Sequence, residues 1–336
     1  MYNGWATKKQ IGHLPKRRFI MKKIIAMLLA IAMVMCLGLA LVSCGDGDDD
    51  GTNNGGDANN GGNNNGGNNN GGNNGGTNAS AKGKIGVQSG TTGQYFVEGD
   101  AEWGFEGLAG YTANGYTNGG MAVQDLINGN VEYVIIDQQP ALELVNKMSG
   151  VKVVNIPLTV EEYAIGVDKA QADLYTAVNG ALAKAKADGV FAAIVEAYAT
   201  GTGINPVTSA TLDLNRKSEQ LVVATNAAFA PFEYKQGDKF VGIDMELAAY
   251  IASELQMELV IIDMEFDSVV TSVGTNGIDV AMAGLTVNDE RRESVNFTDS
   301  YYDAAQVLIV KASDTTFNLC ETADEVVAKL EELAAQ

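Results

Sequence analysis

The amino-acid sequence predicts an α/β protein. Short apolar runs rich in β-branched residues alternate with segments that have the periodicity of amphipathic helices. The alternation occurs twice, and the polar, irregular stretch 199–220 separates the two series. The chain has 336 residues, of which 46% are apolar, so it is long enough for two lobes of roughly 250 residues together with further segments.

Residues 1–44 are predicted to be a signal peptide. Lys22 and Lys23 precede an apolar run from Ile24 to Val42, the order found in export signals. The run ends at Leu-Val-Ser-Cys44, which resembles the lipobox of bacterial lipoproteins, so Cys44 is the expected lipidation site. An uncleaved membrane helix is the alternative, because the run nearly reaches the ~20 residues that span a bilayer.

Residues 45–81 are almost entirely Asn, Gly and Asp. Such a composition cannot bury enough apolar surface to offset the entropy of ordering, so we expect a disordered Asn/Gly-rich tether. Its random-coil span is on the order of 35 Å. A tether of this length would hold a folded domain clear of the membrane at the cell surface or in the periplasm.

Charge and composition exclude several classes of function. The net charge of −20 argues against nucleic acid as a partner, because phosphate backbones would be repelled. His13, the only histidine, precedes the predicted signal, so the mature protein would lack an imidazole for a Ser/His or Cys/His relay or for typical zinc ligation. Cys320 would be the remaining free cysteine, more typical of a small buried residue than of a nucleophile. We expect no metal and no cofactor.

The first alternating series contains four strands and a helix. The helix is predicted over 172–186, where Leu174, Val178 and Leu182 share one face, and Gly189 ends it. Apolar runs of this length suit strands that are buried on both faces. The predicted strands are 84–88, 133–137, 151–156 and 163–167.

The second series follows the 199–220 linker. Helices are predicted near 243–255 and over 323–334. The predicted strands are 221–225, 259–263, 280–284 and 307–310. Together, the two series give the alternation that is typical of an α/β fold.

The local sequence pattern alone predicts two candidate ligand-binding residues, Arg291 and Asp137. Asn288 is a predicted helix cap, which places Arg291 in the first helical turn, where a guanidinium can grip a carboxylate. The alternative is a surface arginine that pairs with Glu290 or Glu293. Asp137 ends a buried strand, where α/β proteins commonly bind ligands, and the alternative for this residue is a helix cap or a turn.

Two pairs of segments resemble the amino-acid-binding proteins of ABC transporters, the polar amino-acid type of solute-binding protein. The segments 231–248 (PFEYKQGDKFVGIDMELA) and 283–302 (AGLTVNDERRESVNFTDSYY) are similar to the opening half of these proteins. The segments 84–93 (KIGVQSGTTG) and 128–137 (NGNVEYVIID) are similar to the later half. The resemblance implies a periplasmic-binding-protein-like type II fold, with two α/β lobes joined by a two-strand hinge.

Because the later half comes first, the domain is predicted to be circularly permuted. Truncated halves of two tandem copies, or lobes exchanged between chains as a swapped dimer, are the alternatives. Under the permutation, residues 199–220 join the family's old ends, and the two ends of the folded part should lie near each other. The predicted regions are 82–165 for the first part of lobe 2, 166–303 for lobe 1 with its internal linker, and 304–336 for the remainder of lobe 2.

The resemblance also implies how a ligand's backbone would be bound. Gly284, Thr286 and Arg291 fall on family positions whose carbonyl, hydroxyl or amide, and guanidinium bind the ligand backbone. Thr92 would meet the ligand carboxylate from the other lobe, and Asp137 would bind the ammonium group.

Four further positions concern the ligand side chain. Gln88 is placed to touch it, and Phe229 and Phe266 match aromatic positions that sandwich it in relatives. Asn226 stands where relatives carry an acid for a cationic or amide side chain, so polar neutral ligands are favoured over Arg or Lys.

The predicted function is a lipid-anchored receptor that captures a polar amino acid and delivers it to an ABC transporter permease. We expect a monomer that is not an enzyme. One alternative is a secreted cyclohexadienyl or arogenate dehydratase, since such enzymes resemble this family. Another is a sensor module that presents the amino acid to a separate membrane kinase.

Overall fold

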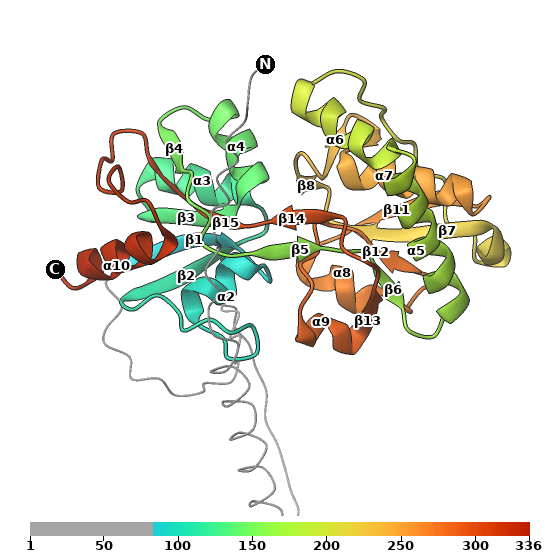
Figure 1. The fold of residues 1–336 in the computed structure, drawn as a ribbon, viewed down its shortest axis with the longest axis horizontal. Helices are drawn as coiled ribbons and strands as arrows, with labels where there is room; N and C mark the ends of the chain where they lie inside the picture. The colour runs from blue at the N-terminus through green and yellow to red at the C-terminus, as the bar shows by residue number, and fades with distance from the viewer. Residues whose placement is uncertain (1–82) are drawn as a thin grey trace, which may run out of the picture. The chain divides into compact units, whose positions relative to one another are not determined.

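A computed structural model describes residues 83–336 (Figure 1). The predicted signal peptide, Cys44 and the Asn/Gly-rich tether lie outside these residues. No helix within residues 83–336 is long and apolar enough to cross a bilayer.

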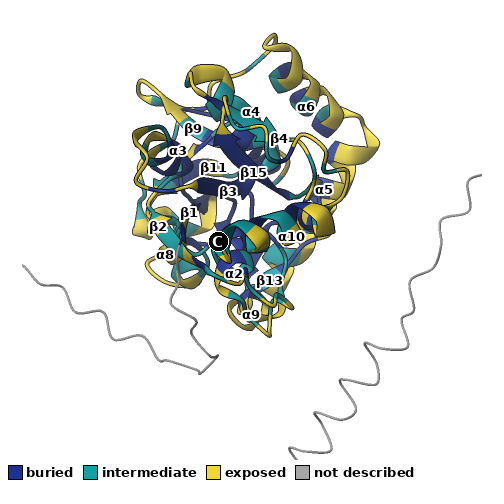
Figure 2. Cartoon of the chain, turned by 90° about the vertical axis from the view of Figure 1, so that its left-hand side faces the viewer, coloured by how far each residue is buried: buried dark blue, intermediate teal, exposed yellow. Residues whose placement is uncertain are grey.

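Lobe 2 is a five-stranded sheet covered by helices on both faces. Neighbouring residues along its strands enter different cores: Val134 and Ile136 pack with α3 and α4, whereas Ile135 packs with α2 and α10. This two-sided burial explains why the strands are apolar throughout, and Figure 2 shows them dark blue inside a shell of more exposed helices. The strands in spatial order are β2 (Tyr111–Tyr116), β1 (Gly83–Gln88), β3 (Tyr133–Asp137), β15 (Gln306–Lys311) and β4 (Val151–Val154). The helices are α2 (Thr92–Glu98), α3 (Gly119–Asn128), α4 (Gln138–Lys147) and α10 (Ala323–Ala334).

Lobe 1 has the same kind of architecture. Helices α5 (Ala172–Ala187), α6 (Val190–Thr200) and α7 (Ile243–Glu254) cover one face of its sheet, and α8 (Phe266–Ser272) and α9 (Asp289–Ser294) cover the other. The strands in spatial order are β11 (Glu258–Asp263), β7 (Gln220–Thr225), β12 (Val280–Ala281), β6 (Gly166–Asp168) and β13 (Val295–Phe297). A small antiparallel sheet of β8 (Ala228–Phe229), β9 (Glu233–Gln236) and β10 (Lys239–Val241) adjoins it.

Two strands connect the lobes. β5 (Glu161–Tyr163) leads from lobe 2 into lobe 1, β14 (Tyr302–Ala304) leads back, and the two pair in antiparallel register with Tyr163 opposite Tyr302 (Figure 1). The first strand after each crossing occupies the fourth place in its sheet and is antiparallel to both neighbours. In lobe 1, β6 lies between β12 and β13; in lobe 2, β15 lies between β3 and β4. The predicted fold class, two α/β lobes joined by a two-strand hinge, is confirmed.

Three predicted strands differ in extent. The run 163–167 is not one strand: β5 ends at Tyr163 and β6 begins at Gly166, because the chain passes here from the hinge into lobe 1. In the run 280–284, only Val280–Ala281 is paired, and the chain then turns through Gly284 with φ = +53°. The strand predicted over 151–156 ends at Val154. The three predicted helices agree with α5, α7 and α10 to within one residue.

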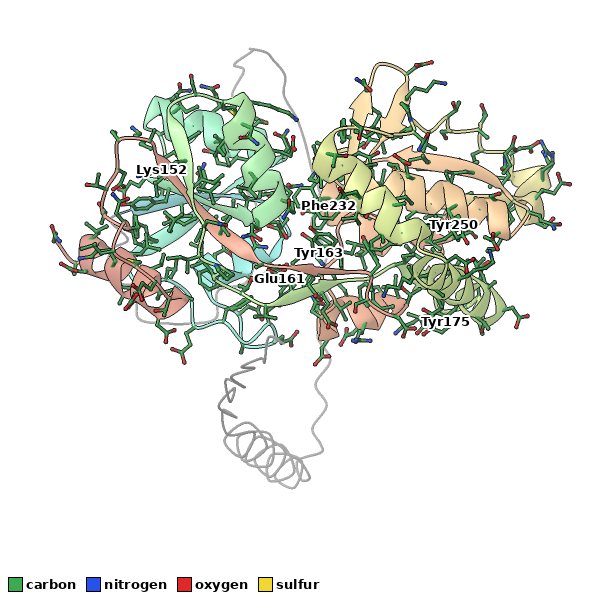
Figure 3. All side chains as sticks on the ribbon, turned by 45° about the horizontal axis from the view of Figure 1, so that its top comes forward. Lys152, Glu161, Tyr163, Tyr175, Phe232 and Tyr250 are labelled. Atoms are coloured by element: carbon green, nitrogen blue, oxygen red, sulfur yellow. The ribbon has the colours of Figure 1, made fainter. Side chains whose placement is uncertain are left out.

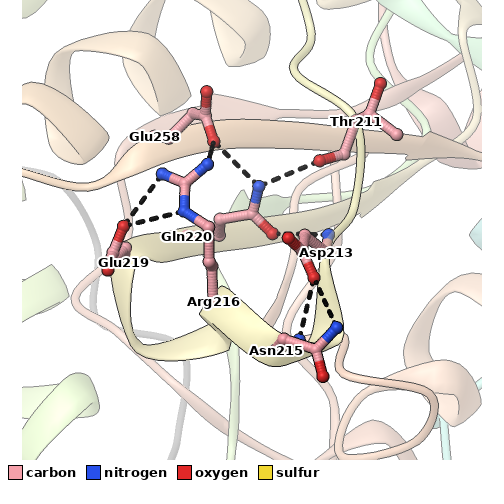
Figure 4. Close-up of polar contacts among 7 residues, drawn as sticks. All are labelled: Thr211, Asp213, Asn215, Arg216, Glu219, Gln220 and Glu258. Carbon is pink, nitrogen blue, oxygen red and sulfur yellow. Dashed lines mark hydrogen bonds and ion pairs between the residues drawn. The ribbon is translucent and has the colours of Figure 1, made fainter.

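The linker 199–220 is polar but firmly attached to lobe 1. Val207 exchanges two backbone hydrogen bonds with Phe240. Gln220, fully buried, donates to the carbonyl of Thr211 at 2.9 Å and to Glu258 at 2.8 Å, and accepts from the Asp213 amide (Figure 4). Side-chain hydrogen bonds therefore add to the apolar contacts of Val207, Ala210 and Leu212 in this segment.

The last helix lies beside the first described strand. Thr322 and Glu325 form a capping box at the start of α10, and Val326 and Leu330 share a core with β1. Gly110 accepts a hydrogen bond from the Gly83 amide, and a side chain at Gly110 would collide with Ala334. Residues 83 and 334 therefore approach the same glycine.

Candidate functional site

Both lobes contribute to a small cavity at their junction. Eight of the nine predicted site residues line it, and the ninth, Asn226, is hydrogen-bonded to Gln88 in its wall. The cavity has a free volume of about 10 Å³, room for a single water molecule. The lining residues are Gln88, Thr91, Thr92 and Asp137 from lobe 2, and Phe229, Phe266, Gly284, Thr286 and Arg291 from lobe 1.

Arg291 lies at one end of this cavity. Asn288 caps α9 as predicted, with its Oδ1 accepting from the Arg291 amide at 2.7 Å. The guanidinium is buried; it donates to the carbonyl of Thr286 at 2.8 Å and to that of Gly90, in lobe 2, at 3.1 Å. It forms no ion pair with any carboxylate of residues 83–336, so the alternative of a surface pair with Glu290 or Glu293 is wrong. Burial lowers its pKa from the usual value.

Aromatic rings cover the Arg291 guanidinium. The ring centres of Trp103, from lobe 2, and Phe266, from lobe 1, lie 5.2 Å and 5.3 Å from its Cζ atom. Trp103 also donates to Glu290 across the lobes at 2.9 Å, and its ring stacks on that of Tyr95. Cation–π contacts of this kind stabilise a desolvated guanidinium without neutralising its charge.

Asp137 supplies a negative group to the same cavity. It stands at the cap position of α4 but makes no capping hydrogen bond; instead, it accepts a short hydrogen bond from the Tyr163 hydroxyl. Burial, together with the negative charge of Glu161, raises its pKa to about 7. Asp137 is therefore the N-cap residue of α4 by position, but its side chain binds Tyr163 and does not cap the helix.

Thr92 and Thr286 meet through a residue that the sequence analysis missed. Their hydroxyl groups both donate to Oε2 of Glu161, each at 2.6 Å. Glu161 is buried in the hinge strand β5, next to Tyr163 at the crossing between the lobes (Figure 3). No local pattern in the sequence marks Glu161, because the strand that carries it has only three residues.

Gln88 and Asn226 form an amide pair across the lobes. Gln88 Nε2 donates to Asn226 Oδ1 at 3.1 Å, and Asn226 Nδ2 donates to the carbonyl of Met264 at 2.8 Å. Gln88 is only 2% exposed, and its Oε1 has no hydrogen-bond partner within residues 83–336. A buried acceptor without a partner favours a ligand that carries a donor.

The backbone at Gly284 approaches two aromatic rings. A Cβ atom there would lie 3.0 Å from Phe229 and 3.2 Å from Tyr163, and φ is positive, so only glycine fits without strain. Its amide donates to the buried Asp244 at 2.9 Å. Phe229 in turn stacks on Phe232 inside lobe 1.

A larger hollow lies outside Arg291, with a free volume of about 340 Å³. It is lined by Tyr95 and Trp103 from one lobe, and by Phe266, Asp267 and Glu290 from the other. Arg291 separates this hollow from the inner cavity, since it borders both. Within residues 83–336, no group of three or more His, Cys, Asp or Glu side chains is placed to hold a metal ion.

Comparison with known proteins identifies one family. Residues 221–336 match the bacterial extracellular solute-binding proteins, family 3. The arginine-binding extracellular protein ArtP of Bacillus subtilis (strain 168) is 38% identical over 93 residues, which are 28% of this chain and 36% of that protein. ABC transporter arginine-binding protein 1 of Escherichia coli (strain K12) is 30% identical over 95 residues, 28% of this chain and 39% of that protein.

A solved structure also matches: the arginine-bound form of domain 1 from TmArgBP is 29% identical, and the match covers 37% of this chain and 98% of that chain with a TM-score of 0.25. The chain spans less than two fifths of the length of the two curated relatives. Residues 221–336 are therefore similar to the bacterial extracellular solute-binding proteins, family 3.

Proposed function

We propose that this protein captures a polar amino acid between its two lobes. One observation carries the proposal: a buried guanidinium without a carboxylate partner, Arg291, and a buried carboxylate, Asp137, face one cavity from opposite lobes. A free amino acid has a carboxylate and an ammonium group, and both must be paired when water is excluded. Arg291 would bind the first with two parallel hydrogen bonds, and Asp137 would bind the second.

Capture requires the lobes to move. The cavity has room for one water molecule, which is too little for any amino acid. Rotation about β5 and β14 is the simplest way to open it, because these two strands are the chain's crossings between the lobes. Closure on the ligand would then bring Arg291 back to the carbonyl of Gly90.

The amide pair favours a neutral ligand side chain. The curated relatives described above are named as arginine-binding proteins, yet Asn226 and Gln88 give this cavity two neutral amides. Asp263, which accepts from the amide of Ala227 beside Asn226, is already paired with Lys235 at 2.6 Å. We therefore propose glutamine or a similar neutral polar amino acid, whose donor would meet Gln88 Oε1.

The complete protein is proposed to act at a membrane. Lipidation at Cys44 would anchor it at the cell surface or in the periplasm, and the tether 45–81 would let the lobes reach an ABC transporter permease. We propose a monomeric, circularly permuted chain. Residues 83 and 334 both approach Gly110, which supports the permutation. In the family's order, the segment that ends at α10 would lead directly into β1, so these two ends must lie close together.

A thermal-shift screen of the twenty amino acids tests the proposed capture. A ligand at 100 times its dissociation constant should stabilise the protein by about 2.7 kcal/mol. Arg291→Ala should abolish this shift. Arg292→Ala is the matched control, because this neighbouring arginine is exposed and outside the cavity; an equal response of both variants to the ligand would contradict the proposal.

One observation favours a second candidate function. Asp137, with its pKa raised to about 7, can hold and release a proton beside a bound ligand near neutral pH, as a general acid requires. The second candidate is therefore a dehydratase of cyclohexadienyl acids. Incubation with prephenate and arogenate decides between the two: product formation supports the enzyme, and recovery of unchanged compound supports the receptor.

A further inference from the structure

Glu161 lies at the junction of the two lobes, where it contacts two residues that line the small cavity, Thr92 and Thr286. The residue is 6% exposed, and its carboxylate accepts four hydrogen bonds. Thr92 and Thr286 donate to Oε2, each at 2.6 Å, whereas Thr159 at 2.6 Å and Gln306 at 3.0 Å donate to Oε1. Four neutral donors satisfy this buried carboxylate, which has no cationic partner within residues 83–336.

The four donors are unequally divided between the lobes. Thr92, Thr159 and Gln306 belong to lobe 2 and its side of the hinge, whereas Thr286 belongs to lobe 1. Glu161 is thus fixed to lobe 2 by three donors and reaches lobe 1 through one. Hinge opening that separates Thr92 from Thr286, which now lie 3.3 Å apart, must break this shared contact.

The contact with Glu161 also determines whether the hydroxyl groups of the two threonines can donate or accept a hydrogen bond in the cavity that they line. A hydroxyl group has one hydrogen and two lone pairs, and both threonines donate to the Glu161 carboxylate. The hydrogens of Thr92 and Thr286 therefore point at Glu161. What remains for a ligand is their lone pairs, which accept from an ammonium group but cannot donate to a carboxylate.

We propose, building on the amino-acid capture proposed above, that Glu161 is a positioning residue of the cleft. It joins the two lobes through Thr286, and it turns the hydroxyl groups of Thr92 and Thr286 into acceptors that hold the ligand's ammonium group together with Asp137. Only Arg291 and backbone amides are then left for the ligand's carboxylate, so Thr92 would meet that carboxylate through its backbone amide and not through its hydroxyl group.

Glu161→Gln tests this role with the smallest change in volume. The amide would keep an oxygen toward Thr159 and Gln306 and place an NH₂ group against Thr92 and Thr286, so that both hydroxyl groups must reverse. Glu162→Gln is the matched control: it makes the same chemical change on the same strand, but its side chain is exposed.

The first measurement concerns closure without ligand. The chain has two tryptophans, Trp5 and Trp103, so a Trp5→Phe background leaves Trp103, which bridges the lobes to Glu290, as the reporter. In the full-length protein in detergent, Glu161→Gln should increase acrylamide quenching of Trp103, and Glu162→Gln should not. Equal quenching in the two variants would overturn the interlobe role, whether or not any amino acid binds.

The second measurement tests the direction of the hydrogen bonds made by the hydroxyl groups of Thr92 and Thr286. Its probes are L-glutamine and its des-amino analogue, glutaramic acid. At pH 8, where Asp137 with its pKa of about 7 is mostly ionised, Glu161→Gln should weaken L-glutamine binding by about tenfold, typical for a lost charged hydrogen bond. It should also reduce the ratio by which L-glutamine binds more tightly than glutaramic acid. A merely structural defect would weaken the binding of both probes equally. An unchanged ratio of the two affinities would therefore overturn the proposal. If Glu161→Gln does not fold, Thr286→Val should reproduce the quenching, with Thr286→Ser restoring the parent value.

Discussion

The two lobes share a strand order but contribute opposite charges to the cavity. Lobe 1 supplies the guanidinium of Arg291, and lobe 2 supplies the carboxylate of Asp137. Neither lobe alone could pair both charges of a free amino acid. The difference teaches that the proposed site exists only at the junction, so that affinity and closure must be coupled.

The largest expected effect comes from breaking this division of charge. Asp137→Asn keeps the size of the side chain and an acceptor for Tyr163, but it removes the negative charge contributed by lobe 2. Leaving the ligand's ammonium group buried and unpaired should cost about 3 kcal/mol or more, a loss of at least a hundredfold in affinity by calorimetry. Asp303→Asn, on the exposed side of β14, is the control. Retained affinity in Asp137→Asn would mean that lobe 2 does not bind the ammonium group.

The next largest effect is the pH dependence of stability, to which each lobe contributes through a different buried carboxyl group. Burial raises the pKa of Asp137 in lobe 2 to about 7 and that of Asp244 in lobe 1 to about 6, so the folded state binds more protons than the unfolded state between pH 4 and these values. Stability should therefore fall as pH rises, by about 2 kcal/mol from pH 5 to pH 7 for Asp137 alone. Burial raises the pKa of Glu233, with a smaller part from Asp244, and this acts in the same direction.

Denaturant unfolding of the ligand-free protein at several pH values measures this slope. Asp137→Asn should remove the part that belongs to lobe 2 and leave the part from Asp244, which lies behind Gly284 rather than in the cavity. A slope of opposite sign between pH 5 and 7 in the parent protein would contradict the argument.

Affinity should change with pH for the same reason. A ligand's ammonium group binds the ionised form of Asp137, so below about pH 7 it must first displace a proton. We expect the dissociation constant to rise about 20-fold from pH 7.5 to pH 5.5. Calorimetry in two buffers of different ionisation enthalpy should show proton release near pH 6, and absence of release would remove Asp137 from the ammonium site.

Much of the fold could be predicted from the sequence because its strands are buried on both faces and its helices are amphipathic. The extent of β5 could not, because a three-residue strand has too few residues to show a period. In the site, the resemblance placed Arg291, Thr286 and Asp137 around one cavity. Glu161 was missed because a Glu-Glu pair is typical of a solvated surface, and only tertiary contacts with three other segments reveal that the first glutamate is buried.

Trp103 was missed for another reason. It lies in a Gly-rich stretch between α2 and β2 that has no periodicity, so its contact with Glu290, 187 positions away, has no local signature.

The smallest expected effect concerns the linker of lobe 1. Gln220→Ala leaves the Asp213 amide without its acceptor and opens a small cavity, so unfolding free energy should fall by about 1 to 2 kcal/mol. Ser218→Ala changes an exposed neighbour whose side chain makes no hydrogen bond within residues 83–336, and it should alter the unfolding free energy by less than about 0.5 kcal/mol. If the two variants are equally stable, the segment is a passive connection.

The order of the strands has a consequence for synthesis on the ribosome. All strands of the lobe 1 sheet lie between residues 166 and 297, whereas β15 must insert between β3 and β4, which are made some 150 residues earlier. The part of the domain that emerges first is thus the last to be finished. During translation, the edges of β3 and β4 that pair with β15 stay unpaired while lobe 1 is already complete. In this interval, the nascent chain is most exposed to chaperones and to aggregation.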